Sequence, residues 1–220
     1  MEGLGRNFTG TSNCLIAMRR EVEAIGTNAH ELPMVYAALA KDDAALAQAP
    51  YTVLSDWHDE HEGNLRIILP DTYGTAGFLK NAPDWLAGWT GIRIDSGDPA
   101  KGAEIALNWW KSRGEDPRRK MVIFSDGLDV DKIAELHRQF DGRVNVSFGW
   151  GTLLTNDFRD LVPNDALAPF SLVCKAVCAN GNPTVKLSDN PEKAMGPAQE
   201  IARYKRVFGV GAQDRIAVVV

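Results

Sequence analysis

The sequence predicts an α/β fold, and within that class an irregular, incomplete TIM-like (β/α) barrel with a C-terminal β-hairpin and helix. One observation behind this prediction is that short apolar strands alternate with helical segments along most of the chain. Another is that each of several successive strands is followed directly by a polar, glycine-rich segment, which we call the tip of the strand. Counting one strand ahead of each tip gives roughly six or seven strands, fewer than the eight of a closed barrel. Because the carboxyl ends of parallel strands lie on one face, we expect a ligand site there.

Length and composition limit the architecture. The chain has 220 residues, of which 45% are hydrophobic, and this is enough for a sizeable core. We assign residues 1–168 to the partial barrel and residues 169–220 to a C-terminal hairpin and helix that pack on it.

Charge and cysteine content limit the partners and the location. The net charge of -5 comes without a basic run, which argues against nucleic acid as a partner. The cysteines number three and show no C-x-x-C spacing, which indicates a reducing, cytoplasmic environment. We expect no membrane segment and no signal peptide, because apolar runs are too short and the N-terminal residues lack the required pattern.

The N-terminal part is predicted to be mainly helical. A Gly-Thr-Ser-Asn turn precedes a helix at residues 14–20. Residues 23–31 indicate a brief strand, a glycine turn and the start of a helix that continues to Leu39. Residues 41–64 are rich in Asp, Ala and His. We interpret them as an exposed, charged helix, because the histidine spacing matches no common metal site.

The central part alternates between strands and helices. Apolar runs mark the strands, and apolar residues at helical spacing mark the helices. The predicted strands are residues 65–70, 91–94, 120–124 and 144–148, and the predicted helices are residues 75–87, 100–111 and 131–140. We expect Trp109 and Trp110 to pack on the sheet.

The C-terminal part is predicted to contain a β-hairpin and a further helix. The pair Asn180-Gly181 favours a tight turn between two strands. The segments are, in order, a polar connection at residues 156–168, strands at residues 170–179 and 184–187, a helix at residues 198–206 and an apolar tail at residues 215–220.

The strand at residues 91–94 runs into the most informative tip. Arg93 offers a planar fork of donors to a phosphate or carboxylate group. Asp95 and Asp98 can accept hydrogen bonds from sugar hydroxyls or hold Mg2+ through water. For this segment alone, the alternative is a solvated turn in which Asp98 begins the next helix.

Repetition of the pattern favours a ligand site over an isolated turn. Three other strands also end in polar or glycine-rich residues, so that four tips are expected on one face. These tips contain Asp71 and Thr72, then Ser125, Asp126 and Gly127, then Gly149, Gly151 and Thr152. His30 lies in the first turn of a predicted helix, where a histidine taken alone is either a surface residue or a catalytic group.

Six motifs in order carry a resemblance to a known family. They are Gly10-Thr-Ser-Asn13, Gly26-Thr-Asn-Ala-His-Glu31, Arg93-Ile-Asp-Ser-Gly-Asp98, Ser125-Asp-Gly-Leu-Asp129, Phe148-Gly-Trp-Gly-Thr152 and Val185-Lys-Leu-Ser-Asp-Asn-Pro-Glu-Lys193. This set resembles the nicotinate phosphoribosyltransferases of the type II phosphoribosyltransferase group. The resemblance implies an irregular α/β barrel, homodimeric at full length, that acts in NAD salvage. Such an enzyme converts nicotinate, phosphoribosyl pyrophosphate and ATP to nicotinate mononucleotide, pyrophosphate, ADP and phosphate.

The resemblance also implies roles for single residues. His30 matches the histidine that ATP phosphorylates in this family, and an imidazole can act as a nucleophile toward a γ-phosphoryl group. Thr27 matches a position that contacts nicotinate, and Arg93 matches one that contacts the nicotinate nucleotide. Thr152 matches a phosphate-contacting position, and the glycines before it leave backbone N–H groups free to approach the anion.

The carboxylates are assigned from their position and charge. Breaking the anomeric C–O bond builds positive charge on the ribose. We expect Asp95 and Asp126 to stabilise this charge, to bind ribose hydroxyls and to contribute to a Mg2+ shell. Further candidates for substrate binding are Asp71, Ser125, Gly127, Gly149 and Gly151.

The resemblance is incomplete at the N-terminus. Family members carry a further N-terminal region that completes the barrel and supplies an aromatic and basic residues for the substrates. We therefore expect this chain to represent a C-terminal part of the enzyme and to have little or no activity alone. The alternatives are a nicotinamide phosphoribosyltransferase, an inactive nucleotide-binding or structural fragment, and a phosphosugar-binding barrel without the histidine step.

Overall fold

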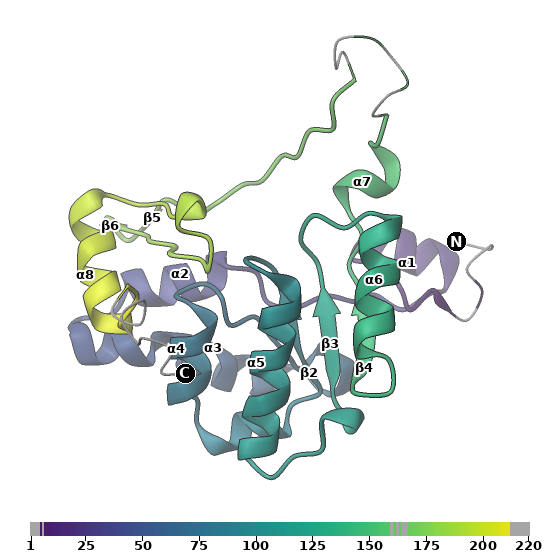
Figure 1. Cartoon of the computed structure of the whole chain (residues 1–220). Coiled ribbons are helices and arrows are strands. Elements are labelled where there is room, and N and C mark those ends of the chain that lie inside the picture. The colour runs from purple at the N-terminus through teal and green to yellow at the C-terminus, as the bar shows by residue number, and fades with distance from the viewer. Residues whose placement is uncertain (1–4, 6, 159–160, 162, 164–166, 212–220) are drawn as a thin grey trace, which may run out of the picture.

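Four parallel strands form the centre of the fold. The computed structural model describes residues 5, 7–158, 161, 163 and 167–211. In the main sheet the strand order is β1 (Ile67–Ile68), β2 (Gly91–Ile94), β3 (Met121–Phe124) and β4 (Asn145–Phe148), and each neighbouring pair is parallel. Because the order in the sheet equals the order in the chain, each strand reaches its neighbour through a crossover that contains a helix (Figure 1).

Three helices cover one face of this sheet. They are α4 (Thr75–Asn81), α5 (Pro99–Ser112) and α6 (Val130–Phe140), and they lie in front of the strands in Figure 1. α5 begins at a proline, and the side chain of Asp98 accepts a hydrogen bond from the backbone N of Lys101 at 2.9 Å. Asp129 caps α6 in the same way through the backbone N of Lys132.

Alternation along the strands separates two faces of the sheet. Ile92, Ile94 and Phe124 are buried in a cluster that also contains Trp110 of α5. Successive side chains of a strand point to opposite faces. Arg93 therefore projects away from the helical layer, and it is only partly buried. The predicted burial of both tryptophans of α5 is confirmed.

The other helices pack beside the sheet. α2 (Glu31–Ala38) contacts α3 (Asp43–Glu60), which also contacts α8 (Ala198–Phe208), whereas α1 (Cys14–Arg20) lies at the opposite end in Figure 1. A second apolar cluster contains Ala37, Leu46, Tyr73, Val185, Leu187 and Tyr204. This cluster holds the C-terminal segment, by which we mean residues 175–211, against α2 and the chain after β1.

Most predicted elements are confirmed, and the differences have local causes. The helix predicted at residues 75–87 ends at Asn81, because Pro83 lacks an N–H and disfavours helical backbone before it. The chain continues as the 3-10 helix η3 (Asp84–Gly88). The strand predicted at residues 65–70 is reduced to β1. Three more short 3-10 helices are η2 (Gly63–Leu65), η4 (Pro117–Arg119) and η6 (Pro191–Lys193).

The brief strand predicted within residues 23–31 also forms only in part. A single parallel bridge joins Thr11 to Ala24, with backbone hydrogen bonds on both sides of it. The chain from this bridge to α2 carries Thr27 and His30 past the carboxyl ends of the main strands.

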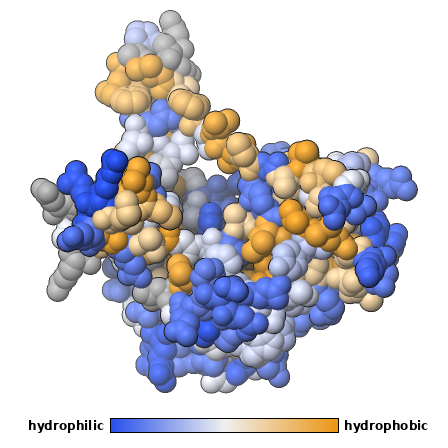
Figure 2. All heavy atoms as spheres, turned by 180° about the vertical axis from the view of Figure 1, so that it is seen from behind, coloured by the Kyte–Doolittle hydropathy of each residue, from blue (hydrophilic) through white to orange (hydrophobic). Residues whose placement is uncertain are grey.

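The predicted hairpin is shorter than expected. Only β5 (Cys178–Ala179) and β6 (Asn182–Pro183) pair, around an Asn-Gly turn in which both residues have positive φ. The strand predicted at residues 184–187 is wrong, because β6 ends at Pro183 and the β pairing of these residues with other described residues is only an isolated bridge from Lys186 to Met195. Beyond α7 (Thr152–Thr155), residues 167–177 run as an extended arm with exposed apolar side chains before β5 (Figures 1 and 2). The strand predicted for residues 170–177 is wrong, because no backbone ladder joins this arm to another strand in the described part of the chain.

Two sequence expectations concern residues at the ends of these segments. The apolar tail at residues 215–220 and part of the connection at residues 156–168 lie outside the described residues. Within the described part of the chain, no helix combines the length and the apolar character needed to cross a membrane.

Gly91 provides a test of the sheet packing. A Cβ atom at this position would lie 2.4 Å from the carbonyl oxygen of Met121. We expect Gly91→Ala to lower the free energy of unfolding by about 1–3 kcal/mol, because the sheet must shift to relieve the overlap. In the control Gly88→Ala, a Cβ meets nothing within 4 Å. Urea unfolding followed by tryptophan fluorescence measures both variants, and equal midpoints would contradict the packing described.

Candidate functional site at the carboxyl ends of the strands

Four strand ends meet at one edge of the sheet, as predicted. Asp95 follows β2 directly, Ser125 follows β3 and Gly149 follows β4, while Asp71 lies shortly after β1. Because the strands are parallel, their carboxyl ends share an edge. Gly149 allows the last two tips to approach, since a Cβ at this position would lie 3.2 Å from Cβ of Ser125.

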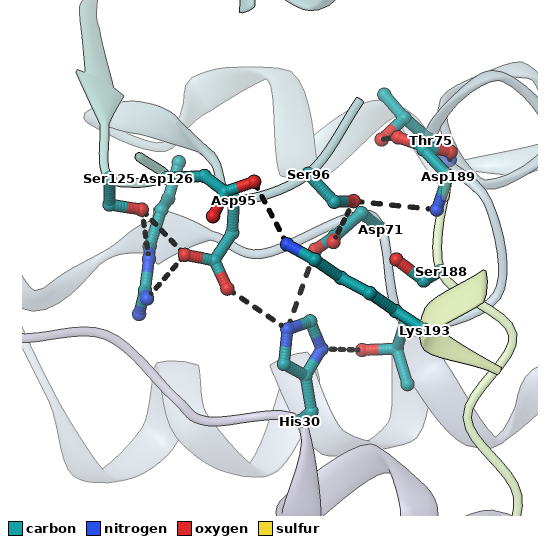
Figure 3. Close-up of polar contacts among 12 residues, drawn as sticks. His30, Asp71, Thr75, Asp95, Ser96, Ser125, Asp126, Ser188, Asp189 and Lys193 are labelled. Atoms are coloured by element: carbon teal, nitrogen blue, oxygen red, sulfur yellow. Dashed lines mark hydrogen bonds and ion pairs between the residues drawn. The ribbon is translucent and has the colours of Figure 1, made fainter. Parts of the chain in front are cut away.

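His30 lies at the centre of this edge. It precedes α2, and only 4% of its surface is exposed. Its Nδ1 lies 2.9 Å from Oγ1 of Thr72, and its Nε2 lies 3.1 Å from Oδ2 of Asp95 (Figure 3). A carboxylate only accepts hydrogen bonds, so Nε2 carries the proton of the neutral ring and Nδ1 accepts from the Thr72 hydroxyl. His30 is therefore not a plain surface residue.

Asp95 connects His30 to the neighbouring tips. Its Oδ1 accepts hydrogen bonds from Nη2 of Arg93 and from the hydroxyl of Ser125, both at 2.7 Å. Burial opposes ionisation of Asp95, but the hydrogen bond with His30, the charge of Arg93 and the hydrogen bond from Ser125 outweigh it and hold the pKa of this carboxyl well below its usual value. Asp95 is thus a fixed negative charge beside the imidazole.

Arg93 joins three segments that are distant in the sequence. Its Nε donates to the hydroxyl of Ser125 at 2.8 Å, and its Nη1 donates to Oγ1 of Thr27 at 3.1 Å. With the bond to Asp95, three of its five N–H donors are engaged. The guanidinium is held in one orientation, and its other two N–H donors have no partner among the described residues and can bind an anion.

Asp71 is the second carboxylate beside His30. Only 1% of its surface is exposed, and its Oδ2 accepts a hydrogen bond from Ser96 at 2.5 Å. Its Oδ1 lies 3.8 Å from Nε2 of His30 and has no hydrogen-bond partner among the described residues. A buried carboxylate oxygen without a donor is costly, which is typical of a site completed by a ligand.

The C-terminal segment adds three lysines to this edge. Lys193 forms an ion pair with Asp126 at 2.9 Å, and Lys175 forms one with Glu31, next to His30, at 2.7 Å. In Figure 3 the Lys193 side chain extends from this segment to the tip of β3. Lys186 is buried, and burial lowers its pKa although the charges of Asp71 and Asp95 oppose this shift.

Sequence reasoning assigned no role to these lysines. Lys186 lies within the last of the six family motifs, and local sequence patterns do not predict that it is buried between Val185 and Leu187. The sequence does contain one signal for this burial, because Lys186 stands between two apolar residues in a short extended segment. Thr72 and Ser96 lie in predicted tips, but their contacts with His30 and Asp71 were not predicted.

The other predicted residues lie around this centre. Asp126 is exposed and pairs with Lys193 at the rim. Asp98 is exposed and caps α5. Its position is therefore the one expected in the alternative interpretation, a solvated turn in which Asp98 begins the next helix. Gly127 has a φ of +60°, as a left-handed turn requires. Gly151 and Thr152 are exposed at the start of α7. The ligand roles of these residues stay predictions.

Comparisons with known proteins point to one enzyme family. The sequence model of the nicotinate phosphoribosyltransferase (NAPRTase) family matches residues 1–212. A nicotinate phosphoribosyltransferase structure from Vibrio cholerae is 37% identical with a TM-score of 0.81, over 91% of this chain and 48% of the other. One from Porphyromonas gingivalis is 32% identical with a TM-score of 0.82, over 94% and 52%. A putative one from Saccharomyces cerevisiae is 32% identical with a TM-score of 0.78, over 92% and 49%. The chain thus spans about half the length of these proteins.

The lowered pKa of Asp95 predicts a pH-dependent contribution to stability. A carboxyl whose folded pKa is depressed stabilises the fold above its unfolded pKa, about 3.9, and loses this contribution as the pH falls toward the folded pKa. We expect Asp95→Asn to lower the free energy of unfolding by about 1–3 kcal/mol at pH 7. The difference from the wild type should shrink at about pH 3, below that unfolded pKa.

Urea unfolding at both pH values measures this difference. The control is Asp126→Asn, which removes an exposed ion pair and should cost at most ~1 kcal/mol. A difference between wild type and Asp95→Asn that does not change with pH would contradict the electrostatic role of Asp95.

Proposed function

The chain belongs to the nicotinate phosphoribosyltransferase family, and on this basis we propose that it carries the catalytic centre of such an enzyme. The proposed reaction forms nicotinate mononucleotide from nicotinate and phosphoribosyl pyrophosphate and is coupled to ATP hydrolysis. The observation that carries the proposal is the position of His30, a buried imidazole at the meeting point of the strand ends, between two carboxylates.

The first proposed step is phosphorylation of His30. In the tautomer set by Asp95, the lone pair lies on Nδ1, and the carboxylate makes the ring a better nucleophile by accepting the Nε2–H hydrogen bond. Nδ1 attacks the γ-phosphorus of ATP, the bond from this phosphorus to the β-γ bridging oxygen breaks, and ADP leaves. The ring keeps its Nε2–H, so the positive charge of the phosphorylated imidazole stays paired with the ionised carboxylate of Asp95. Thr72 must release Nδ1 for this step, which a hydroxyl can do by rotation.

The second proposed step is transfer of the phosphoribosyl group. The C–O bond between the anomeric carbon and pyrophosphate breaks, and the ring nitrogen of nicotinate forms the new bond to this carbon. Positive charge develops on the ribose in the transition state. Asp95 stays ionised because Arg93 and Ser125 hold it, so it can stabilise this charge. Water then cleaves the N–P bond of His30, which releases phosphate and restores the imidazole.

Arg93 and Thr27 are suited to recognise the substrate carboxylate. The free donors of Arg93 match the planar geometry of a carboxylate, and the contact with Thr27 places a hydroxyl beside them. Nicotinamide has no negative charge to pair with this guanidinium. The site therefore favours nicotinate, and nicotinamide is the alternative that a direct comparison must exclude.

The carboxylates near His30 also fit the Mg2+ that accompanies diphosphate substrates. Asp71 and Asp95 each have one oxygen engaged by protein donors and one oxygen directed toward His30. Mg2+ prefers such oxygens and keeps several waters. When bound, it offsets the negative charge of the phosphates. Asp98 fits this role less well, because its carboxylate caps a helix.

Two further features belong to the proposal. The four parallel strands resemble one side of a TIM-like barrel, since the edge strands β1 and β4 each pair with one strand only in the described part of the chain. We propose that additional strands complete the barrel in the whole enzyme. A homodimer is supported by the exposed apolar arm before β5, because such surfaces are commonly covered by a partner (Figure 2).

Phosphorylation of His30 gives the most direct test. After incubation with ATP labelled at the γ-phosphate, we expect up to one labelled phosphoryl group per chain, stable in base and labile in acid as an N–P bond is. His30→Asn should lose the label, because it removes the nucleophile. His137→Ala, which removes an exposed imidazole on α6, should retain it. Absence of label from the wild type, or label that persists in His30→Asn, would contradict this step and favour an inert fragment.

Discrimination between nicotinate and nicotinamide tests the role of Arg93. Equilibrium dialysis with labelled nicotinate should show weaker binding to Arg93→Lys by roughly 10- to 100-fold, because a lysine cannot reproduce the fork of charge-assisted hydrogen bonds. The control Arg118→Lys changes an exposed arginine that pairs with Asp116 and should bind as the wild type does. Nicotinamide competing as strongly as unlabelled nicotinate would support the alternative substrate.

A further inference from the structure

Three potential metal ligands converge beside the imidazole of His30. They are Nε2 of His30, Oδ2 of Asp95 and Oδ1 of Asp71 (Figure 3). Nε2 lies 3.1 Å from the first oxygen and 3.8 Å from the second. One ligand atom from each of these residues lies within 4.8 Å of the others, and no other group of three or more such residues does so among the described residues. This spacing suits one cation bound to all three.

Each ligand is held by a hydrogen bond at its other polar atom. Thr72 contacts Nδ1 of His30 at 2.9 Å, Ser125 donates to Oδ1 of Asp95 at 2.7 Å, and Ser96 donates to Oδ2 of Asp71 at 2.5 Å. Such outer contacts orient the ligands of metal sites, since they fix the imidazole ring and leave one carboxylate oxygen free. The set is therefore oriented before any ion binds.

Asp71 supplies an independent indication of a ligand. Its Oδ1 is buried and accepts no hydrogen bond among the described residues, although polar atoms in such positions are nearly always paired. His30 Nε2 donates to Asp95 at the shorter distance, so it does not satisfy this oxygen. A cation at the centre of the three atoms would provide the missing partner.

We propose that His30, Asp71 and Asp95 form a binding site for one divalent first-row transition-metal ion, for which Zn2+ is the representative. Imidazole nitrogen with carboxylate oxygens suits Zn2+, whereas Mg2+ favours oxygen ligands and retains its waters. Charge does not select between these two divalent ions, and it is partly offset because Arg93 pairs with Asp95 and the charge of Lys186 acts on both carboxylates. The histidine nitrogen therefore decides the preference for a transition metal.

Metal binding would make this ion an inhibitor of His30 phosphorylation. The ion replaces the proton on Nε2, withdraws electron density from the ring and occupies the space between the two carboxylates. Nδ1 is then a weaker nucleophile. This consequence rests on the proposed function, whereas metal binding itself does not.

Equilibrium dialysis of the chain against ZnCl2 in a non-chelating buffer tests the site. We expect one Zn2+ per chain at this site, and at least a tenfold loss of affinity in Asp95→Asn and in His30→Asn. Ser96→Ala keeps all three ligands and removes the bond that orients Asp71, together with the long contact from the backbone N of Asp189 at 3.4 Å. It should therefore lower the affinity by roughly 10- to 100-fold. His137→Ala is the matched control and should bind as the wild type does. Circular dichroism establishes that each variant is folded.

Spectroscopy and competition identify the ligands. Co2+ in place of Zn2+ should give visible d–d bands in the wild type that disappear in His30→Asn, and a hundredfold excess of Mg2+ should not abolish them. No Zn2+ binding by the wild type would overturn the proposal, as would Zn2+ affinity that is the same in wild type, His30→Asn and Asp95→Asn.

A separate measurement tests the inhibitory consequence. With Mg2+-ATP in excess, Zn2+ at concentrations that fill the site should reduce labelling of His30 by at least tenfold, and a chelator should restore it. Full labelling at saturating Zn2+ would overturn the inhibition while leaving the metal site in place. If the chain binds Zn2+ as described but shows no labelling under any condition, the proposed phosphorylation fails and the metal site stands.

Discussion

The hydrogen bonds of Asp95 join the parts of the chain that form the site. One oxygen of this carboxylate binds Arg93 and Ser125, and the other binds His30, which lies 65 positions away in the sequence. These bonds are possible only because β2 and β3 are parallel and end at the same edge. The sheet thus sets the position of the carboxylate, and the carboxylate sets the orientation of the imidazole. A change in the register of β2 would move Arg93 and Asp95 together away from Ser125 and His30.

Burial and charge are balanced at this edge. Two carboxylates face one imidazole, and desolvation alone would raise the pKa of Asp95. The guanidinium of Arg93 compensates directly, and the ammonium of Lys186 acts from the C-terminal segment. The apolar cluster that contains Val185 and Leu187 keeps this lysine beside the strand ends. Packing of the C-terminal segment is therefore part of the electrostatics of the site.

The sequence allowed prediction of the strand ends but not of everything that surrounds them. Alternation along β2 indicated that Arg93 and Asp95 lie at a tip, because the period of a strand is a local property. The burial of Lys186 depends on contacts with distant segments, which local patterns do not record. Residues 170–177 have the composition of a strand, yet no neighbouring strand pairs with them in the described part of the chain. A strand depends on its partner, and composition alone cannot supply one.

The arrangement around His30 suits a nucleophile and a metal ligand for the same physical reason. In both roles one ring nitrogen must be fixed by a neighbour so that the other is available in a known direction. Asp95 fixes Nε2 when the ring acts as a nucleophile, whereas Thr72 fixes Nδ1 when Nε2 binds a metal. The two roles exclude one another because they place opposite demands on the electron density of one imidazole. Asp71 favours the metal-bound arrangement, since a cation would pair with its Oδ1, which has no hydrogen-bond partner among the described residues.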